Sequence, residues 1–112
     1  MSKSRLEDLE IYIEATNIAN EVWNTVISWN DFEKRTVGMQ LCRAIDNVGA
    51  NIEEGFGRGS RLDNARFSKI ARASLFESKH WLAQANTRRV LTVDLNNIIS
   101  ERIENLIPGV SA

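Results

Sequence analysis

Apolar residues recur along the chain at intervals of three and four, and this spacing predicts amphipathic helices. The first helix is expected from Ser4, which forms a capping-box pair with Glu7, to about Trp29. Its buried row is predicted to be Tyr12, Ala15, Ala19, Val22, Val26 and Trp29. Nowhere do four or more residues alternate cleanly in the strand pattern. The pattern therefore indicates an all-helical protein.

A second helix is expected after Asn30 with Glu33, or Asp31 itself, as its N-terminal cap. Its core face is predicted to hold Val37, Leu41, Ala44, Ile45, Val48, Ile52 and Phe56. The helix then reaches a group of glycines, where it is expected to end.

The third helix is expected to begin at the pair of Ser60 and Asp63, which has cap-like spacing, and to run to about Arg89. Its buried residues are predicted to be Phe67, Ile70, Ala71, Ser74, Leu75, Trp81, Leu82 and Ala85. Short links make each long helix turn back along its predecessor. The prediction is an all-α, antiparallel up-down-up-down four-helix bundle.

The fourth helix is shorter and is expected to begin at Thr92 or Asp94. Pro108 and Gly109 are expected to stop it, because proline cannot donate the backbone hydrogen bond that continues a helix. Its inward residues are predicted to be Leu95, Ile98, Ile99, Ile103 and Leu106.

Length and composition fit one domain over residues 1–112, of which 43% are hydrophobic. Cys42 is the only cysteine, so no internal disulfide forms and a reducing compartment is expected. The sequence has neither the apolar run of a signal peptide nor a stretch of about 20 apolar residues for a membrane span. A cytoplasmic location with no membrane contact is the expectation.

Gly55, Gly57 and Gly59 alternate beside two arginines, a pattern that resembles a phosphate-binding loop. Such loops follow a strand and open a helix, whereas this one follows a helix and lacks a Gly-Lys-Ser/Thr sequence. We therefore expect Gly57 or Gly59 to adopt the left-handed conformation that ends a helix.

Glu77 and His80 have the Glu-x-x-His spacing of di-iron bundles, which makes a metal-dependent enzyme the alternative hypothesis. Such sites need two of these pairs, and His80 is the only histidine. Cys42 would need His80 as its base, with no third group to orient the pair. The prediction is a non-enzymatic protein with no cofactor and no metal.

A polar stripe follows the second helix at intervals of three or four, through Gln40, Arg43, Asn47, Asn51 and Glu54. One interpretation is a solvated face. The other is a partly buried network in which Arg43 and Glu54 meet Ser74 and Glu77 of the third helix and fix the helix register, because an unpaired buried charge is costly.

Charge is unevenly distributed, with a net charge of −5 over residues 1–56 and +4 over residues 57–112. From Arg58 to Arg89, eight basic residues face only two acidic ones. Phe76 is expected to project from this basic strip, as a stacking platform, a protein contact or an ordinary exposed residue. The residues expected to contact a nucleic acid or a partner are Arg58, Arg61, Arg66, Lys69, Arg72, Phe76 and Lys79.

The first helix carries a second apolar line, formed by Leu6, Leu9 and Ile13, with Trp23 and Ile27 further along. Beside it runs an acidic edge formed by Glu7, Glu10, Glu14 and Glu21. A monomer could not bury both apolar faces of this helix. Contact between this surface and the basic surface of the next subunit would be heterologous, and repeating it with a closing rotation would give a ring. Leu6, Leu9 and Ile13 are therefore predicted to form an interface in a homo-oligomer.

The segments QLCRAIDNVGANIEEGFGRGS and ARFSKIARASLFESKHWLAQA resemble the bacterial four-helix-bundle family that includes proteins encoded by intervening sequences in 23S ribosomal RNA genes. This resemblance implies an antiparallel four-helix bundle and a five-membered ring. It also implies kinship with the accessory variability proteins of diversity-generating retroelements. Those proteins bind a reverse transcriptase and nucleic acid, RNA or DNA, through a basic ring surface.

Overall fold

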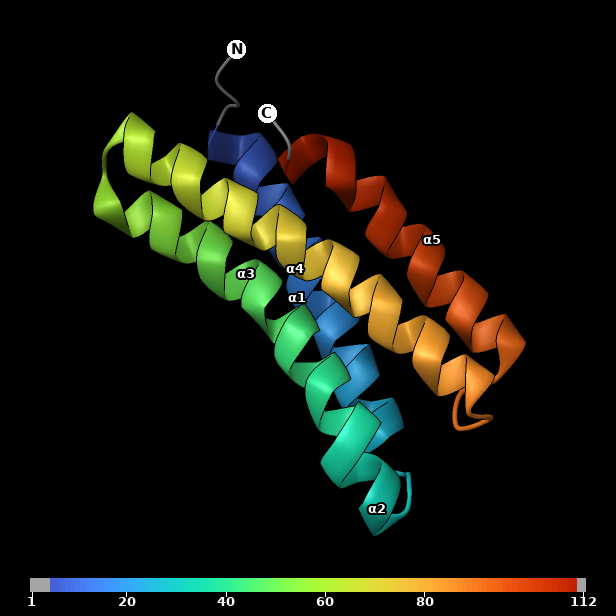
Figure 1. The fold of residues 1–112 in the computed structure, drawn as a ribbon. Helices are drawn as coiled ribbons and strands as arrows, with labels where there is room; N and C mark the ends of the chain where they lie inside the picture. Colours follow the sequence, from blue (N-terminus) through green and yellow to red (C-terminus); the bar gives the residue numbers. More distant parts are fainter. Residues whose placement is uncertain (1–4, 111–112) are drawn as a thin grey trace.

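The computed structural model describes residues 5–110, and all its regular elements are helices (Figure 1). Their order is α1 (Arg5–Val26), α2 (Asp31–Glu33), the π-helix η1 (Lys34–Gly38), α3 (Met39–Arg58), α4 (Arg61–Thr87) and α5 (Val93–Val110). Because α2, η1 and α3 follow one another without a break, they act as one long helix. The prediction of an all-helical four-helix bundle is confirmed.

The long helices form an elongated bundle in which α1 and α4 occupy opposite corners (Figure 1). Helix α1 packs against α3 and α5, and α4 also packs against α3 and α5. Helices α1 and α4 begin at the same end, since the Arg5 guanidinium lies 6.0 Å from the Phe56 ring and the Arg58 guanidinium lies 5.3 Å from the Phe67 ring. Their outer faces therefore point away from each other.

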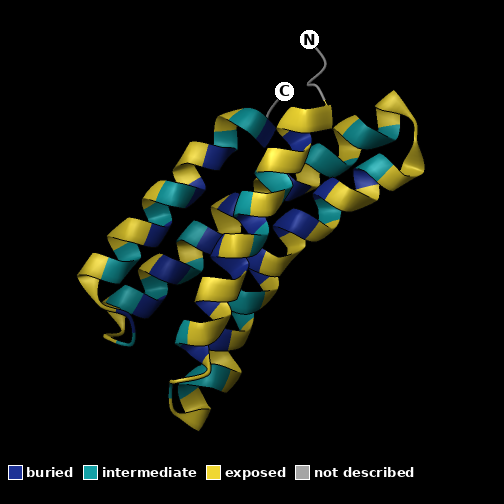
Figure 2. Cartoon of the chain, turned by 180° about the vertical axis from the view of Figure 1, so that it is seen from behind, coloured by how far each residue is buried: buried dark blue, intermediate teal, exposed yellow. Residues whose placement is uncertain are grey.

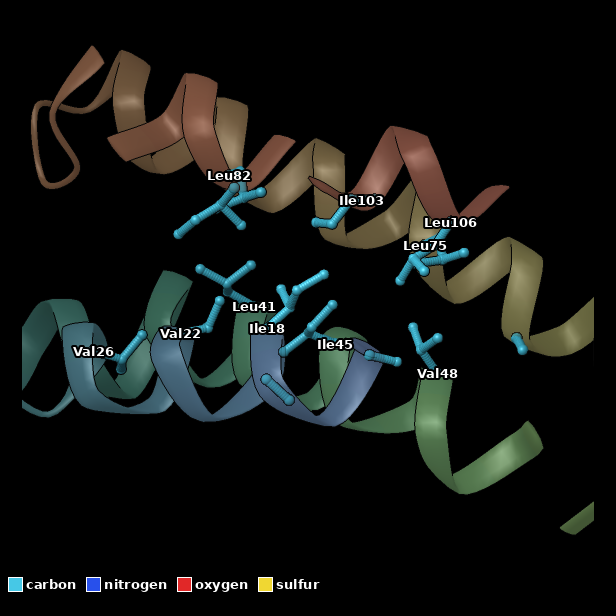
Figure 3. Close-up of a cluster of buried hydrophobic side chains, with 14 of the residues drawn as sticks. Ile18, Val22, Val26, Leu41, Ile45, Val48, Leu75, Leu82, Ile103 and Leu106 are labelled. Carbon is cyan, nitrogen blue, oxygen red and sulfur yellow. The ribbon is translucent and has the colours of Figure 1, made fainter. Parts of the chain in front are cut away.

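The core is a single apolar cluster to which every long helix contributes (Figure 3). Exposed residues cover the outer faces of the helices, and buried ones face inward (Figure 2). Burying one such aliphatic side chain contributes roughly 1.5–3 kcal/mol to folding. The largest fully buried side chains include Ile18, Leu41, Ile45, Leu75, Leu82, Ile99 and Ile103.

Three of the predicted N-terminal caps are present. The Asn30 side chain accepts the backbone N–H of Glu33 at 3.0 Å, and the Ser60 hydroxyl accepts that of Asp63 at 3.1 Å. The Thr92 hydroxyl accepts the N–H of Leu95 at 3.2 Å, which decides between Thr92 and Asp94. The predicted cap at Ser4 lies outside the described residues.

The π-helical turn η1 is a feature that the apolar spacing did not predict. It ends at Gly38, where an added Cβ would lie 2.7 Å from Val26 Cγ1 and 3.0 Å from the Glu33 carbonyl oxygen. Only a residue without a side chain fits between these groups, so Gly38 lets the end of α1 pack tightly against η1. The same absence of a side chain lets Gly49 pack close to Thr16, since an added Cβ would lie 3.1 Å from Thr16 Cγ2.

The prediction of burial is wrong for two residues. Ile70 of α4 and Ile98 of α5 are both exposed, because each lies one position beside the row that faces the bundle axis. The predicted ends of the first and third helices are also too late, since α1 stops at Val26 and α4 at Thr87.

The predicted stop at Pro108 is wrong as well, because α5 continues to Val110. Proline removes one backbone hydrogen bond in this last turn, and the burial of Val110 in the core holds the turn in place.

The glycine cluster is a corner, as predicted. Gly59 ends α3 with a φ of 76°, and its N–H donates to the Phe56 carbonyl. Gly55 has another role, since an added Cβ would lie 3.2 Å from Phe67 Cβ. Gly55 therefore allows α3 and α4 to approach closely just before the corner.

Candidate functional site

The basic strip predicted on α4 is present on its outer face and on the corner before it. We define the basic strip as Arg58, Arg61, Arg66, Lys69, Arg72 and Lys79 with Phe76. Three of its cations have carboxylate partners: Arg58 pairs with Glu54 at 3.0 Å, Arg66 with Asp63 at 3.3 Å, and Lys79 with Glu104 of α5 at 2.9 Å. Among the described residues, Arg61 and Lys69 have no carboxylate partner.

Two cations of the basic strip lie close to the aromatic ring of Phe76. The Arg72 guanidinium lies 5.0 Å from the centre of the Phe76 ring, and the Lys79 ammonium lies 6.0 Å from it. Phe76 itself is 45% exposed. Each such cation–π contact stabilises the arrangement by about 0.5–1 kcal/mol at an exposed site. Arg72 and Lys79 thus form a cluster of two positive charges around one accessible ring.

The apolar row predicted on α1 is also accessible in the single chain. Leu6, Leu9 and Ile13 are 64%, 50% and 48% exposed. These residues spaced at three and four form a continuous apolar surface on the outer face of α1. The described residues of the same subunit leave this row exposed.

The acidic edge of α1 is partly used inside the subunit. Arg102 of α5 donates from Nε and Nη2 to the two carboxylate oxygens of Glu14, at 3.2 and 3.0 Å, and from Nη1 to Glu21. These bonds raise the pKa of Arg102. Glu14 and Glu21 therefore hold α5 against α1, while Glu7 and Glu10 of the same edge are exposed.

The predicted polar network between α3 and α4 is not formed by the described residues of one chain. Arg43, Glu54 and Glu77 are exposed. Their hydrogen bonds stay within single helices, from Arg43 to Met39 Sδ, from Arg58 to Glu54, and from Trp81 to Glu77. Asn51 likewise donates to the Asn47 carbonyl at 2.7 Å. In the single chain, Arg43, Asn47 and Glu54 of the stripe are exposed, whereas Gln40 and Asn51 are half-buried.

Glu77 and His80 are not arranged as a metal-binding pair. Glu77 accepts the indole N–H of Trp81 at 3.2 Å, and the His80 ring packs edge-on against Trp81 at 4.8 Å. Within residues 5–110, no group of three or more His, Cys, Asp or Glu side chains is placed to hold a metal ion. Both side chains are instead engaged with one tryptophan.

Two hollows lie between α1 and α3, one toward each end of the bundle. The larger, about 640 Å³, is lined by apolar side chains that include Trp23, Ile27 and Met39, and by Cys42. Burial, with a smaller effect from Asp46, raises the pKa of the Cys42 thiol. A raised pKa disfavours the thiolate, whereas reactive cysteines have a lowered pKa.

The smaller hollow, about 210 Å³, includes Tyr12 and Glu53. A hydrogen bond to the Glu53 carboxylate, with a smaller effect of its charge, raises the pKa of Tyr12. The hollow thus brings a side chain of α1 and a side chain of α3 together.

Sequence reasoning missed the residues that connect helices through long side chains. The charge pattern predicts Lys79 as a partner contact, yet its ammonium group also forms a salt bridge with Glu104 of α5. Arg102 was not singled out, although it lies between apolar positions of α5 and faces two glutamates spaced two turns apart on α1. The spacing of these two glutamates was the sequence feature that could have indicated a basic partner on another helix.

None of the helices in the described part of the chain has the length and apolar character needed to cross a bilayer. A comparison with curated proteins found no match. A solved structure from Bacteroides thetaiotaomicron VPI-5482, described as a protein of unknown function from the S23 ribosomal protein family, is 19% identical in sequence. It superimposes with a TM-score of 0.82, covering 93% of this chain and 94% of that chain, so it has the same fold.

The family model described as 23S rRNA-intervening sequence protein matches residues 7–111, which is nearly the whole chain. The matched region includes the four long helices, the corner at Gly59 and the basic strip. The chain therefore belongs to the family of 23S rRNA-intervening sequence proteins.

Proposed function

We propose that this protein is a non-catalytic, self-assembling scaffold that binds the phosphates of a nucleic acid through the basic strip of α4. The observation that carries the proposal is the cluster in which Arg72 and Lys79 flank the accessible ring of Phe76. Cations neutralise phosphates and release their counterions, and an exposed ring offers a base a surface for stacking. Arg61 adds charge that no carboxylate of the described residues neutralises.

The local charge matters because the whole chain has a net charge of only −1. Bulk attraction to nucleic acid is therefore absent, and binding depends on the basic strip alone. The resemblance to the accessory variability proteins of retroelements supports the same kind of partner, a nucleic acid that is handled together with a reverse transcriptase. Retention of a protein partner without nucleic acid would be the competing outcome.

Self-assembly is the second half of the proposal, and the exposed apolar row of α1 supports it. In a cyclic assembly, α1 of one copy packs against the α4 surface of the next, so that each copy uses two different faces. Because α1 and α4 occupy opposite corners, one chain can make both contacts at once. The family resemblance favours five subunits. Light scattering at micromolar concentration tests the assembly, which a monomeric mass would refute.

Nucleic-acid binding is tested by fluorescence anisotropy with a labelled hairpin RNA and a duplex DNA of equal length. The test variant is Arg61→Gln/Arg72→Gln, and the control is Arg35→Gln/Arg88→Gln, which removes the same charge from exposed positions off the strip. We expect the test variant to lower the slope of log affinity against log salt by about 1.5–2, the effect of two lost phosphate contacts.

The control variant should retain the slope and most of the affinity. Equal losses in both variants would show that only overall charge matters. No binding of the wild-type protein to either probe would refute the nucleic-acid function.

A further inference from the structure

A second apolar row is exposed on the first half of α4, and one of its two members, Ile70, was predicted to be buried. Leu62 is 82% exposed and Ile70 is 43% exposed. Arg66 lies between them, and residues four apart form one row on a helix surface. This row lies closer to the α4 N-terminus than the Arg72, Phe76 and Lys79 cluster. Helix α4 thus presents two surfaces, one with aliphatic residues near its start and one with cations around a ring further along.

The α4 row matches the α1 row in length and in position along the bundle. Leu6 and Ile13 are seven positions apart, about 10 Å, and Leu62 and Ile70 are eight positions apart, about 12 Å, at 1.5 Å per residue. Both rows begin in the first turns of helices that start at the same end (Figure 1). Rotation about an axis parallel to the helices does not change height along that axis. A cyclic assembly would therefore bring the two rows together at the same level.

The charges beside the two rows are opposite. Glu10 is exposed beside the α1 row, and Lys69 is exposed beside the α4 row, three positions after Arg66. Lys69 has no carboxylate partner among the described residues, whereas Arg66 pairs with Asp63. The α1 row is therefore apolar and acidic, and the α4 row is apolar and basic. Contact between two different rows brings opposite charges together, whereas contact between two copies of the same row would bring like charges together.

We infer that Leu62 and Ile70 of one copy receive Leu6, Leu9 and Ile13 of the next copy, with Glu10 of one copy opposite Lys69 of the other. This inference rests on the self-assembly proposed above and specifies its contact. If this contact forms, part of the basic strip binds the neighbouring subunit and the other part remains for nucleic acid. Arg66 and Lys69 lie at the subunit contact, while Arg72, Phe76 and Lys79 stay accessible to nucleic acid.

The contact is tested by the molar mass of the full-length protein in size-exclusion chromatography with light scattering. Leu62→Glu/Ile70→Glu should be monomeric, with the circular dichroism spectrum of a folded helical protein. Ile98→Glu is the control, because Ile98 is an aliphatic residue on α5, off both rows, whose 55% exposure lies between those of Ile70 and Leu62. It should retain the mass of the wild-type assembly.

A charge reversal provides an independent measurement. Glu10→Lys should raise the subunit dissociation constant by about tenfold or more, because it places two cations opposite each other. Adding Lys69→Glu should restore assembly, whereas adding Lys79→Glu should not.

The outcomes separate the inference from the proposed function. Persistent assembly of Leu62→Glu/Ile70→Glu, with dissociation of Leu9→Glu, would overturn the inferred contact and leave self-assembly intact. The absence of rescue by Lys69→Glu would also overturn it. A monomeric wild-type protein would refute the assembly itself.

Discussion

Replacing Gly38 and, separately, Gly57 by alanine introduces the same methyl group into two different surroundings. Both residues have helical backbones, and alanine in a helix is favoured over glycine by up to about 1 kcal/mol. At Gly57 an added Cβ meets no atom within 4 Å. At Gly38 it would lie 2.7 Å from Val26 Cγ1 and 3.0 Å from the Glu33 carbonyl oxygen. The two substitutions should therefore change stability in opposite directions.

The size of the effect at Gly38 depends on whether these neighbours can move. Val26 is buried and β-branched, so its χ1 angle is fixed in a helix, and the Glu33 oxygen belongs to the backbone. Overpacking of this kind costs about 2–3 kcal/mol, which exceeds the gain in helix propensity. We expect Gly38→Ala to lower the free energy of unfolding by about 1–2 kcal/mol. Gly57→Ala should raise it by about 0.5 kcal/mol, because it lies near a helix end.

Urea unfolding followed by circular dichroism measures both values at one protein concentration, since assembly makes stability concentration-dependent. With a slope of about 1.5 kcal/mol/M, the two midpoints should differ by about 1 M or more. An unchanged or higher midpoint for Gly38→Ala would refute the argument, because it would mean that α1 and η1 separate at little cost.

Two further predictions concern single side chains. Arg102→Met should lower the free energy of unfolding by about 1–2 kcal/mol, because it removes charge-assisted bonds that are partly screened by solvent. A double-mutant cycle with Glu14→Gln in thermal unfolding checks this, and additive effects would contradict it. Asp46→Asn should speed alkylation of Cys42 by iodoacetamide at about pH 8, since the thiolate is the nucleophile and removing a nearby negative charge lowers its pKa. An unchanged rate would assign the raised pKa to burial alone.

The parts of the fold that could be predicted from sequence are those set by neighbouring residues. The caps at Asn30 and Ser60 were predictable because the donor and the acceptor lie three positions apart. The corner at Gly59 was predictable because left-handed backbone favours glycine. By contrast, Ser78 is fully buried although serine is polar, because its hydroxyl donates to the Ser74 carbonyl one turn earlier.

The rest depends on how each helix rotates about its own axis. Ile70 and Ile98 have apolar side chains at plausible core positions, and only the packing of neighbouring helices places them outside. The bonds from Arg102 to Glu14 join residues 88 positions apart, so no local pattern fixes them. The candidate basic strip was recognisable from the spacing of its charges. Its division into one part near Ile70 and another around Phe76 could be seen only from the way α4 is oriented in the bundle.

The packing of α5 against α1 has a consequence for the order in which the chain folds. Helices α1 with α3, and α3 with α4, are neighbours along the sequence, and their contacts close short loops. The contact of α5 with α1 closes the longest loop in the bundle, which carries the largest entropic cost. We therefore expect the first three long helices to associate early and the Arg102 bonds to form last, so that during synthesis part of the core surface stays open until the final helix arrives.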